Sequence, residues 1–356
     1  MQNRIRLFKP YVPREMIQEI SEVLASGQLA QGPRVDEFEG NFAKFFMLRE
    51  AVSMSSGTAA LETAYELAGL KAGDEVITTP LTCAATNLPL IRLGCKLVWA
   101  DVLQSTLCID PLDVHSKITK KTKAVVQVHL GGIRAHVGKI HIPLISDACQ
   151  ALGIFAGDYT ACSFQAIKHF TSGDGGMLIC KKEEDAHKAK LLRWFGIDRS
   201  RQVKNDWESY RTRMMCFDIE VPGCKRQMND ISAAMALVGL KHYNEIFDHR
   251  KKIFEIYRAR LSSLKGVSLV DGPENVYWLA TLLVDRRDDF AKMLFEADID
   301  CNVVQVRNDI YKIFGGKRAD LPTLKNIEGK YVSIPIGMHV SEDDVNYICD
   351  KIEGGW

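Results

Sequence analysis

The amino-acid sequence indicates an α/β protein with a mostly parallel central sheet flanked by helices, followed by a smaller C-terminal α+β domain. Short runs rich in Val and Ile alternate with segments of helical spacing, which is typical of such a sheet. Near residue 228 the alternation gives way to long helical periodicity. A chain of 356 residues is long enough for two domains. We therefore expect a large domain over residues 1–227 and a small domain over residues 228–356.

Apolar spacing in the first half predicts the elements of the large domain in order. Helices are expected over residues 13–25 and 58–70, and Gly27 is placed to end the first of them. Further strand and helix units lead to a strand at 123–130. Three more short strands are expected in the segments PLISDAC, TACSFQ and GGMLICK.

The C-terminal part has a different pattern of apolar residues. Long helices are expected after Met228, and the segment YWLATLLVD reads as a strand. A polar loop is expected around residues 302–325, and a closing helix is expected to begin at Ser341.

Composition narrows the classes of function. The net charge is +1, which provides no electrostatic reason to bind nucleic acid or a membrane. The ten cysteines form no CxxC pair, and no Cys/His cluster has zinc-ligand spacing, so we expect no metal and a reducing compartment. The N-terminus lacks the apolar core of a signal peptide, and no apolar run reaches the roughly 18 residues of a membrane span. We therefore expect a cytoplasmic protein.

Two segments of the large domain carry groups that suit an anionic ligand. In SSGTAAL, small residues with a glycine precede a helix, so exposed N–H groups and the helix dipole could hold a phosphate. The alternative is an ordinary Ser/Thr N-cap. Asp147 ends the apolar strand PLISDA, where α/β sheets place ligands. It is either a helix cap or a fixed negative charge for a ligand.

Two residues further along complete a possible site. Ser163 is either a strand serine or a hydroxyl for the same phosphate, and Lys168 is either a solvated lysine or a nucleophile. The sequence GDGG after Lys168 supplies flexible backbone that would let another group approach. A phosphate turn, an acid for a heteroaromatic nitrogen and a lysine for a carbonyl are what pyridoxal phosphate requires. They occur here in that order.

On these and neighbouring motifs the chain resembles the DegT/StrS family of pyridoxal-phosphate-dependent nucleotide-sugar aminotransferases, which have the fold-type I architecture. The motifs are QGPRVDEFE, SSGTAALETA, KAGDEVITTPLT, SDACQALG, SFQAIKHFTSGDGG, MNDISAAMALVGL and QVRND. The resemblance implies that Lys168 is the Schiff-base lysine and that Asp147 pairs with the pyridine nitrogen. It places Gln150 beside the ring, near the phenolic oxygen.

The resemblance also implies the phosphate site and one departure from the family. Gly57 and Thr58 would bind the phosphate, with a hydroxyl from Ser163. A partner subunit of a homodimer would reach the same phosphate through Lys225, which stands where an Asn is common. Cys83 stands where the family often has an aromatic residue on the outer face of the ring.

Two connections are shorter than is usual in the family. They cover residues 131–146 and 153–159, and in relatives both lie near the active-site side of the sheet. Trimmed loops leave the sheet core intact but could change access for a sugar.

The implied reaction moves an amino group from L-glutamate to a nucleotide-linked keto sugar, here a 4-keto-6-deoxy sugar, and yields an amino sugar. Lysine rather than histidine at position 168 favours transamination over dehydration. Candidate substrate-binding residues are Arg193, Lys225 and Arg226, whose alternative is an ordinary solvated charge. Arg307 and Asn308 could reach the sugar or the donor carboxylate.

Three other functions stay open on the sequence alone. One is a regulator that binds the cofactor without catalysis. Another is an assembly protein in which the motifs only cap helices. The third is an enzyme of the same family that aminates carbon 3 of a sugar or a cyclitol.

Overall fold

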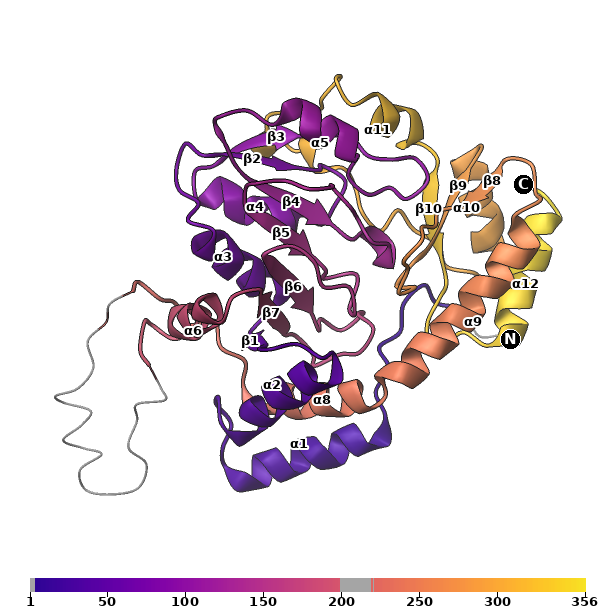
Figure 1. Cartoon of the computed structure of the whole chain (residues 1–356). Coiled ribbons are helices and arrows are strands. Elements are labelled where there is room, and N and C mark those ends of the chain that lie inside the picture. The colour runs from indigo at the N-terminus through magenta and orange to yellow at the C-terminus, as the bar shows by residue number, and fades with distance from the viewer. Residues whose placement is uncertain (1–3, 199–218, 220) are drawn as a thin grey trace.

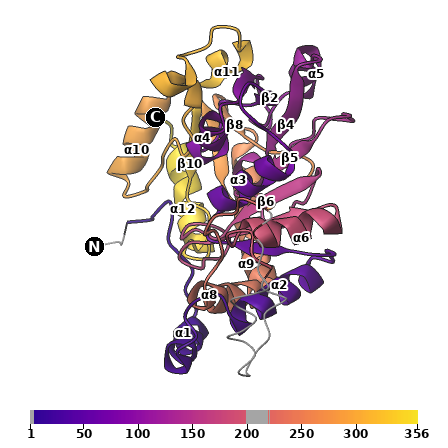
Figure 2. The same ribbon diagram turned by 90° about the vertical axis from the view of Figure 1, so that its left-hand side faces the viewer.

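A computed structural model describes residues 4–198, 219 and 221–356 of the chain. Figure 1 shows a large unit built around one sheet, with a smaller unit of strands and helices beside it. Figure 2 gives the perpendicular view, in which α1 lies at one end of the molecule and α11 at the other. Among the described residues, no helix is both long enough and apolar enough to cross a membrane.

The large unit contains a seven-stranded sheet in the order β1-β7-β6-β5-β4-β2-β3. The strands β2 to β6 run parallel to one another, and β7 is antiparallel to both β1 and β6. The predicted mostly parallel sheet is therefore confirmed. The strands are β1 (Val52–Met54), β2 (Glu75–Thr78), β3 (Lys96–Trp99), β4 (Thr122–Val128), β5 (Leu144–Asp147), β6 (Tyr159–Ser163) and β7 (Gly176–Cys180).

Helices cover both faces of this sheet. Apolar side chains of α3 and α6 pack on one face, and those of α2 and α8 pack on the other. The first predicted helix is confirmed as α1, and Gly27 ends it with φ 73°. The helices are α1 (Arg14–Ser26), α2 (Pro33–Phe45), α3 (Gly57–Leu67), α4 (Ala84–Arg92), α5 (Pro111–Lys117), α6 (Glu183–Leu192) and α8 (Asp230–Lys241).

The connection from β4 to β5 carries no α-helix. It contains only the short 3-10 helix η1 (Leu130–Gly132), in which Gly131 has φ 65°. This connection begins beside the carboxyl end of β4, which is one of the strand ends that α/β sheets use for ligands.

The small unit has a three-stranded antiparallel sheet in the order β10-β9-β8. Its closing helix begins after Ser341, which forms a capping box with Asp344, so the predicted start is confirmed. The elements are β8 (Val267–Leu269), β9 (Ala280–Val284), β10 (Tyr331–Ile334), α9 (Tyr243–Leu261), α10 (Arg287–Glu296), η3 (Asn308–Ile310), η4 (Lys312–Phe314), α11 (Pro322–Ile327) and α12 (Glu342–Glu353).

The boundary between the two units stays a prediction. Helix α8 and the first turn of α9, with Tyr243 and Ile246, pack in the same core as α2 of the large unit. From Ile253 onward, α9 packs with α12 and the small sheet. We therefore propose that the small unit begins inside α9 rather than at residue 228.

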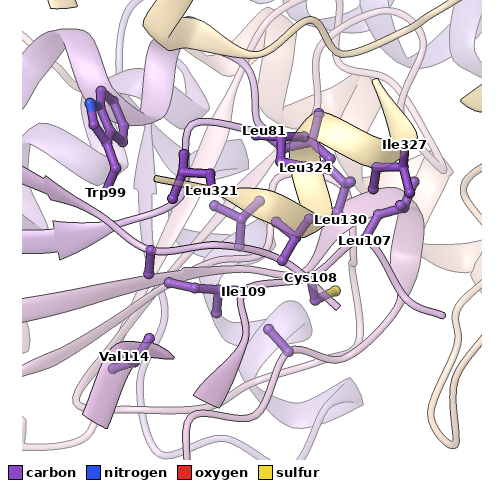
Figure 3. Close-up of a cluster of buried hydrophobic side chains, with 14 of the residues drawn as sticks. Leu81, Trp99, Leu107, Cys108, Ile109, Val114, Leu130, Leu321, Leu324 and Ile327 are labelled. Carbon is purple, nitrogen blue, oxygen red and sulfur yellow. The ribbon is translucent and has the colours of Figure 1, made fainter. Parts of the chain in front are cut away.

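Helix α11 joins the two units near the carboxyl ends of β2 and β3. Figure 3 shows Leu321 and Leu324 beside Leu81 of the large unit, all within one buried cluster. The Asp101 carboxylate, just after β3, accepts hydrogen bonds from the backbone N–H groups of Thr323 and Leu324 at 2.7 and 2.9 Å. These hydrogen bonds hold α11 near the carboxyl ends of β2 and β3, on the side of the sheet where the candidate site lies.

Candidate active site

Asp147 ends β5 and lies between the carboxyl ends of β4 and β6. Its side chain is buried, and its Oδ2 accepts a hydrogen bond of 2.6 Å from the Thr86 hydroxyl of α4. That hydroxyl shares a second hydrogen bond with Thr82 at 2.8 Å. The other carboxylate oxygen accepts from the backbone N–H of Cys149 at 3.0 Å. Asp147 is therefore an oriented acid at a strand end, and it caps a turn rather than a helix.

The SSG turn forms a compact cradle at the start of α3. Ser56 is the N-cap, and its hydroxyl accepts from the Ala59 N–H at 3.1 Å, so the capping interpretation is correct for this residue. The first hydrogen bond of the helix runs from the Ala60 N–H to the Ser56 carbonyl. The N–H groups of Gly57 and Thr58 precede it and have no carbonyl partner within the helix. These two N–H groups lie at the positive end of the helix dipole and suit an anion.

Only glycine fits at position 57. A Cβ atom there would lie 2.8 Å from the Ser163 Cβ and 2.7 Å from the Cys149 sulfur. Ser163 therefore borders the start of α3, and its predicted role as a phosphate-binding hydroxyl stays a prediction. The donors present, which are two backbone N–H groups and one hydroxyl, fit the phosphate of pyridoxal phosphate.

Lys168 lies in the turn that connects β6 to β7. Burial lowers the pKa of its amine, while the nearby ionisable groups Cys149, Asp147 and Cys83 oppose that shift. A lysine with a lowered pKa is more often neutral, which a nucleophile toward a carbonyl needs. The structure thus brings Lys168, Asp147 and Cys83 into one neighbourhood.

His169, the next residue, lies in the interior. Its Nε2 is 2.8 Å from the carbonyl oxygen of Val276, and burial lowers the pKa of its imidazole to about 3. His169 is therefore a neutral core histidine, and Lys168 is the residue of this pair that meets the candidate site.

Gln150 is buried just beyond β5. Its Oε1 accepts from the backbone N–H of Gly131 at 2.9 Å, so its amide NH₂ group is the part left to donate to a ligand. Cys83 is exposed and is the N-cap residue of α4. It lies near Lys168, and its place at the outer face of a ring stays a prediction.

Three residues near the site did not follow from the sequence analysis. Thr86 orients Asp147, Cys149 separates Asp147 from the Gly57 turn, and Trp278 holds its ring 4.1 Å from the Lys168 Nζ. Cys149 stands two residues after Asp147, so its place in the turn after β5 could have identified it as a neighbour of the site. No local pattern connects Thr86 or Trp278 with the lysine segment.

Two of the candidate arginines brace helices of the large unit. Arg193 is buried, forms an ion pair with Glu39, and donates to the Ser53 carbonyl at 2.9 Å. Arg226 pairs with Glu62 and Glu66 of α3 at 3.3 and 2.7 Å. The structure therefore places both guanidinium groups in ion pairs within the protein, and we do not assign them to a substrate.

Arg307 and Asn308 are also engaged within the protein. Arg307 is buried and forms a bidentate pair with Asp309, with distances of 2.7 and 2.6 Å. Asn308 donates to the Thr82 carbonyl at 2.7 Å and accepts from Asn87 at 2.8 Å. These contacts connect the small unit with the loop that leads to Cys83. We therefore propose a structural role for both residues in place of the expected contact with a sugar or a donor carboxylate.

Lys225 lies on an exposed segment beside the SSG turn. The neighbouring Arg226 carbonyl accepts from the Ser55 N–H at 2.7 Å, and Lys225 itself forms a backbone bridge with Trp194. No ion pair of the Lys225 side chain is found among the described residues. Its position next to the turn is compatible with a phosphate contact in the same chain or across a dimer.

Comparisons with known proteins identify the family of this chain. The family model of the DegT/DnrJ/EryC1/StrS aminotransferase family matches residues 10–353. The spore coat polysaccharide biosynthesis protein SpsC of Bacillus subtilis (strain 168) is 33% identical, over 96% of this chain and 95% of its own length. The crystal structure of AtS13 from Actinomadura melliaura is 32% identical with a TM-score of 0.91, and the match covers 100% of both chains.

A second solved structure is similar to the same degree. The sugar aminotransferase CalS13 from Micromonospora echinospora is 29% identical with a TM-score of 0.91, and the match covers 99% of this chain and 100% of that one. The cofactor of such enzymes is pyridoxal 5'-phosphate, and the Gly57 cradle, Asp147 and Lys168 fit it. The chain is thus an aminotransferase that uses pyridoxal 5'-phosphate, and it belongs to the DegT/DnrJ/EryC1/StrS aminotransferase family.

Proposed function

We propose that this enzyme moves an amino group from L-glutamate to a nucleotide-linked 4-keto-6-deoxy sugar and so produces an amino sugar. The observation that carries the proposal is the half-buried Lys168 amine in the same neighbourhood as the oriented Asp147 carboxylate, beside the cradle at Gly57. The similarity to a polysaccharide biosynthesis protein and to a sugar aminotransferase supports a sugar as the acceptor.

Each residue of the site has a defined part in this proposal. Asp147 supplies the negative charge opposite the pyridine nitrogen, and the N–H groups of Gly57 and Thr58 bind the phosphate with the Ser163 hydroxyl. The amide of Gln150 donates toward the phenolic oxygen. Bound pyridoxal phosphate supplies an electron sink for charge that develops on the substrate carbon.

Lys168 has two tasks. Its Nζ would hold the cofactor through the aldehyde carbon, with loss of one water, and as a free amine it would take a proton from one carbon and return it to another. The lowered pKa supports the first task because a neutral amine is the nucleophile, and burial supports the second because water is kept away from the proton.

The proposal includes a homodimer with shared sites, in which Lys225 of one subunit contacts the phosphate of the other. The exposed position of Lys225 beside the SSG turn supports a contact that a second copy completes. Mixing Lys168→Ala chains with Lys225→Ala chains tests this arrangement. Activity restored in the mixture is expected, whereas no restoration would mean that each chain uses its own Lys225.

A cytoplasmic location is part of the same proposal. The nine described cysteines are all free, which supports a reducing compartment.

The substrate is tested with L-glutamate and a panel of dTDP-, UDP- and GDP-linked keto sugars that carry the keto group at carbon 4 or carbon 3. Amination of a 4-keto sugar is expected, and Lys168→Ala should abolish it. Amination only of a 3-keto sugar or a cyclitol would correct the substrate. A protein that binds the cofactor but does not react with glutamate would be a regulator, and the proposal would fail.

A further inference from the structure

Trp278 brings the small unit into contact with the reactive lysine. It lies just before β9, its side chain is almost fully buried, and the Lys168 Nζ is 4.1 Å from the centroid of its ring. The indole Nε1 donates to the carbonyl oxygen of Ile167 at 3.0 Å. One side chain therefore binds the backbone just before the lysine and also presents its face to the lysine amine.

The indole ring and its backbone are held by neighbouring residues. The ring of Phe8 stacks with it at a centroid distance of 5.9 Å and an interplanar angle of 23°. Arg250 of α9 donates to the Trp278 carbonyl at 3.1 Å and to the Ile336 carbonyl at 3.4 Å. Contacts with the N-terminal segment, with α9 and with the loop after β10 thus set the orientation of Trp278. Its ring is therefore held in one position beside the lysine.

The surroundings of the Lys168 Nζ explain why the indole ring could stabilise its charge. No hydrogen bond from this Nζ to any residue in the described parts of the chain is found, although burial disfavours its charged form. The ionisable groups that face it are Asp147, Cys149 and Cys83. An aromatic face attracts an ammonium ion most strongly where water is excluded, and tryptophan does this best.

We propose that the indole face of Trp278 is the position to which the Lys168 ammonium docks whenever the lysine is not bonded to the cofactor. Trp278 is then a positioning residue for the proposed aminotransferase reaction, on which this inference rests. It keeps the free amine beside the site between the two halves of the reaction and offsets part of the effect by which burial disfavours the charged form. The Ile167 hydrogen bond keeps the lysine turn in register with the ring.

The alternative is that Trp278 only fills space and ties down the turn. The two ideas differ in one respect: a purely structural indole does not respond to the charge of Lys168. The test therefore measures the ring itself in the full-length protein. Fluorotryptophan replaces all five tryptophans, and the ¹⁹F signal of Trp278 is identified by its loss in Trp278→Phe.

Three forms of the protein are titrated with pH. Without cofactor and with pyridoxamine phosphate, where the lysine is free, the Trp278 signal should shift with the protonation of Lys168. With pyridoxal phosphate the lysine nitrogen is bonded to the cofactor, and this shift should disappear. Lys168→Met, which keeps the length of the side chain without its charge, should lack the shift in all three forms.

Progressive fluorination of the indole gives the decisive measurement. It weakens the attraction for a cation but keeps the shape of the ring and its N–H group. The midpoint of the lysine titration should fall by roughly half a pH unit or more between singly and fourfold fluorinated indole. This series makes no substitution at position 278, and the signal that titrates in the parent protein but not in Lys168→Met can be followed through it. The result therefore does not depend on whether Trp278→Phe folds.

Two results would overturn the inference: a Trp278 signal that titrates identically in Lys168→Met, and a midpoint that does not move with fluorination. Neither measurement requires a sugar. A chain that shows the titration but aminates no keto sugar would refute the proposed function alone. A chain that aminates sugars without the titration would refute only the role of Trp278.

Discussion

The Thr86 hydroxyl and the Asp147 carboxylate are joined by a buried hydrogen bond of 2.6 Å, which connects the first turn of α4 with the end of β5. A hydrogen bond to a charged group stabilises more than one between neutral groups. This contact fixes which way the acid faces, so its loss should affect the cofactor more than the fold.

We expect Thr86→Val to weaken the binding of pyridoxal phosphate about tenfold, since a hydrogen bond to a charged group contributes about 1.5 kcal/mol or more. A cofactor titration followed by absorbance measures this change. Thr160→Val is the matched control, because the Thr160 hydroxyl donates to the Ala156 carbonyl at 2.7 Å near the opposite end of β6. Equal losses of affinity in both variants would contradict the assigned role of Thr86.

The cradle at Gly57 predicts a steric effect on the same measurement. In Gly57→Ala the new methyl group would meet Ser163 and the Cys149 sulfur, so the start of α3 must shift. We expect cofactor affinity to fall at least tenfold, about 1.4 kcal/mol, because the phosphate donors move with the backbone.

Gly40→Ala provides the control for that substitution. Gly40 lies inside α2, and a Cβ atom there meets nothing within 4 Å. This change should raise the free energy of unfolding by about 0.5–1 kcal/mol and leave cofactor affinity unchanged. Unchanged cofactor affinity in Gly57→Ala would show that the phosphate binds elsewhere.

The buried pair of Arg307 and Asp309 predicts a loss of stability rather than of substrate binding. Arg307→Lys keeps the charge but cannot make the bidentate contact, and its ammonium would be poorly matched to the buried carboxylate. We expect the free energy of unfolding in urea to fall by about 2–4 kcal/mol. The KM for the sugar should change less than threefold. A large increase in KM with unchanged stability would return Arg307 to the substrate site.

His242 predicts a pH-dependent link between α1 and α9. Its Nε2 lies 2.7 Å from Glu15 and its Nδ1 lies 2.9 Å from Glu245, and these contacts raise the pKa of the imidazole. Because the pKa is higher in the folded than in the unfolded state, the stabilisation is fully present below the unfolded value, near about 6.5. It is lost as pH rises through the folded value.

The variant His242→Gln tests the direction in which this stabilisation changes with pH. The difference in unfolding free energy between the parent protein and this variant should be largest at about pH 6 and should shrink as pH rises toward about 8.5. Glu15 has a lowered pKa, chiefly through its hydrogen bond with His242, so its own contribution is lost only in acid. A difference that grows with pH would contradict the interpretation.

The sequence predicted the parts of the site that depend on local chemistry. Asp147 at a strand end and Gly57 at a helix start are recognisable because strand ends and helix starts are local features. The roles of the arginines were harder to predict, because the position of a residue along the chain does not show whether a carboxylate such as Glu39 pairs with Arg193. Trp278 reaches Lys168 only through the packing of the small unit, which no periodicity encodes.

The strand run that contains Trp278 illustrates the same limit. The segment YWLATLLVD reads as one strand, yet β9 begins only at Ala280. The residues before it leave the sheet, and the backbone of Trp278 is bonded to Arg250 instead of to a neighbouring strand. A pattern of apolar residues indicates burial, but it does not distinguish burial in a sheet from burial against a reactive side chain.

The contact of Ile5 with residues of the small unit has a consequence for biosynthesis. The Ile5 N–H donates to the Asp298 carbonyl, and the Ile5 carbonyl accepts from the Asp300 N–H, both at 2.9 Å. A ribosome releases residue 5 long before it releases residues 298–300. Ile5 of each nascent chain must therefore wait until the segment around residue 300 has emerged before it reaches its final partners.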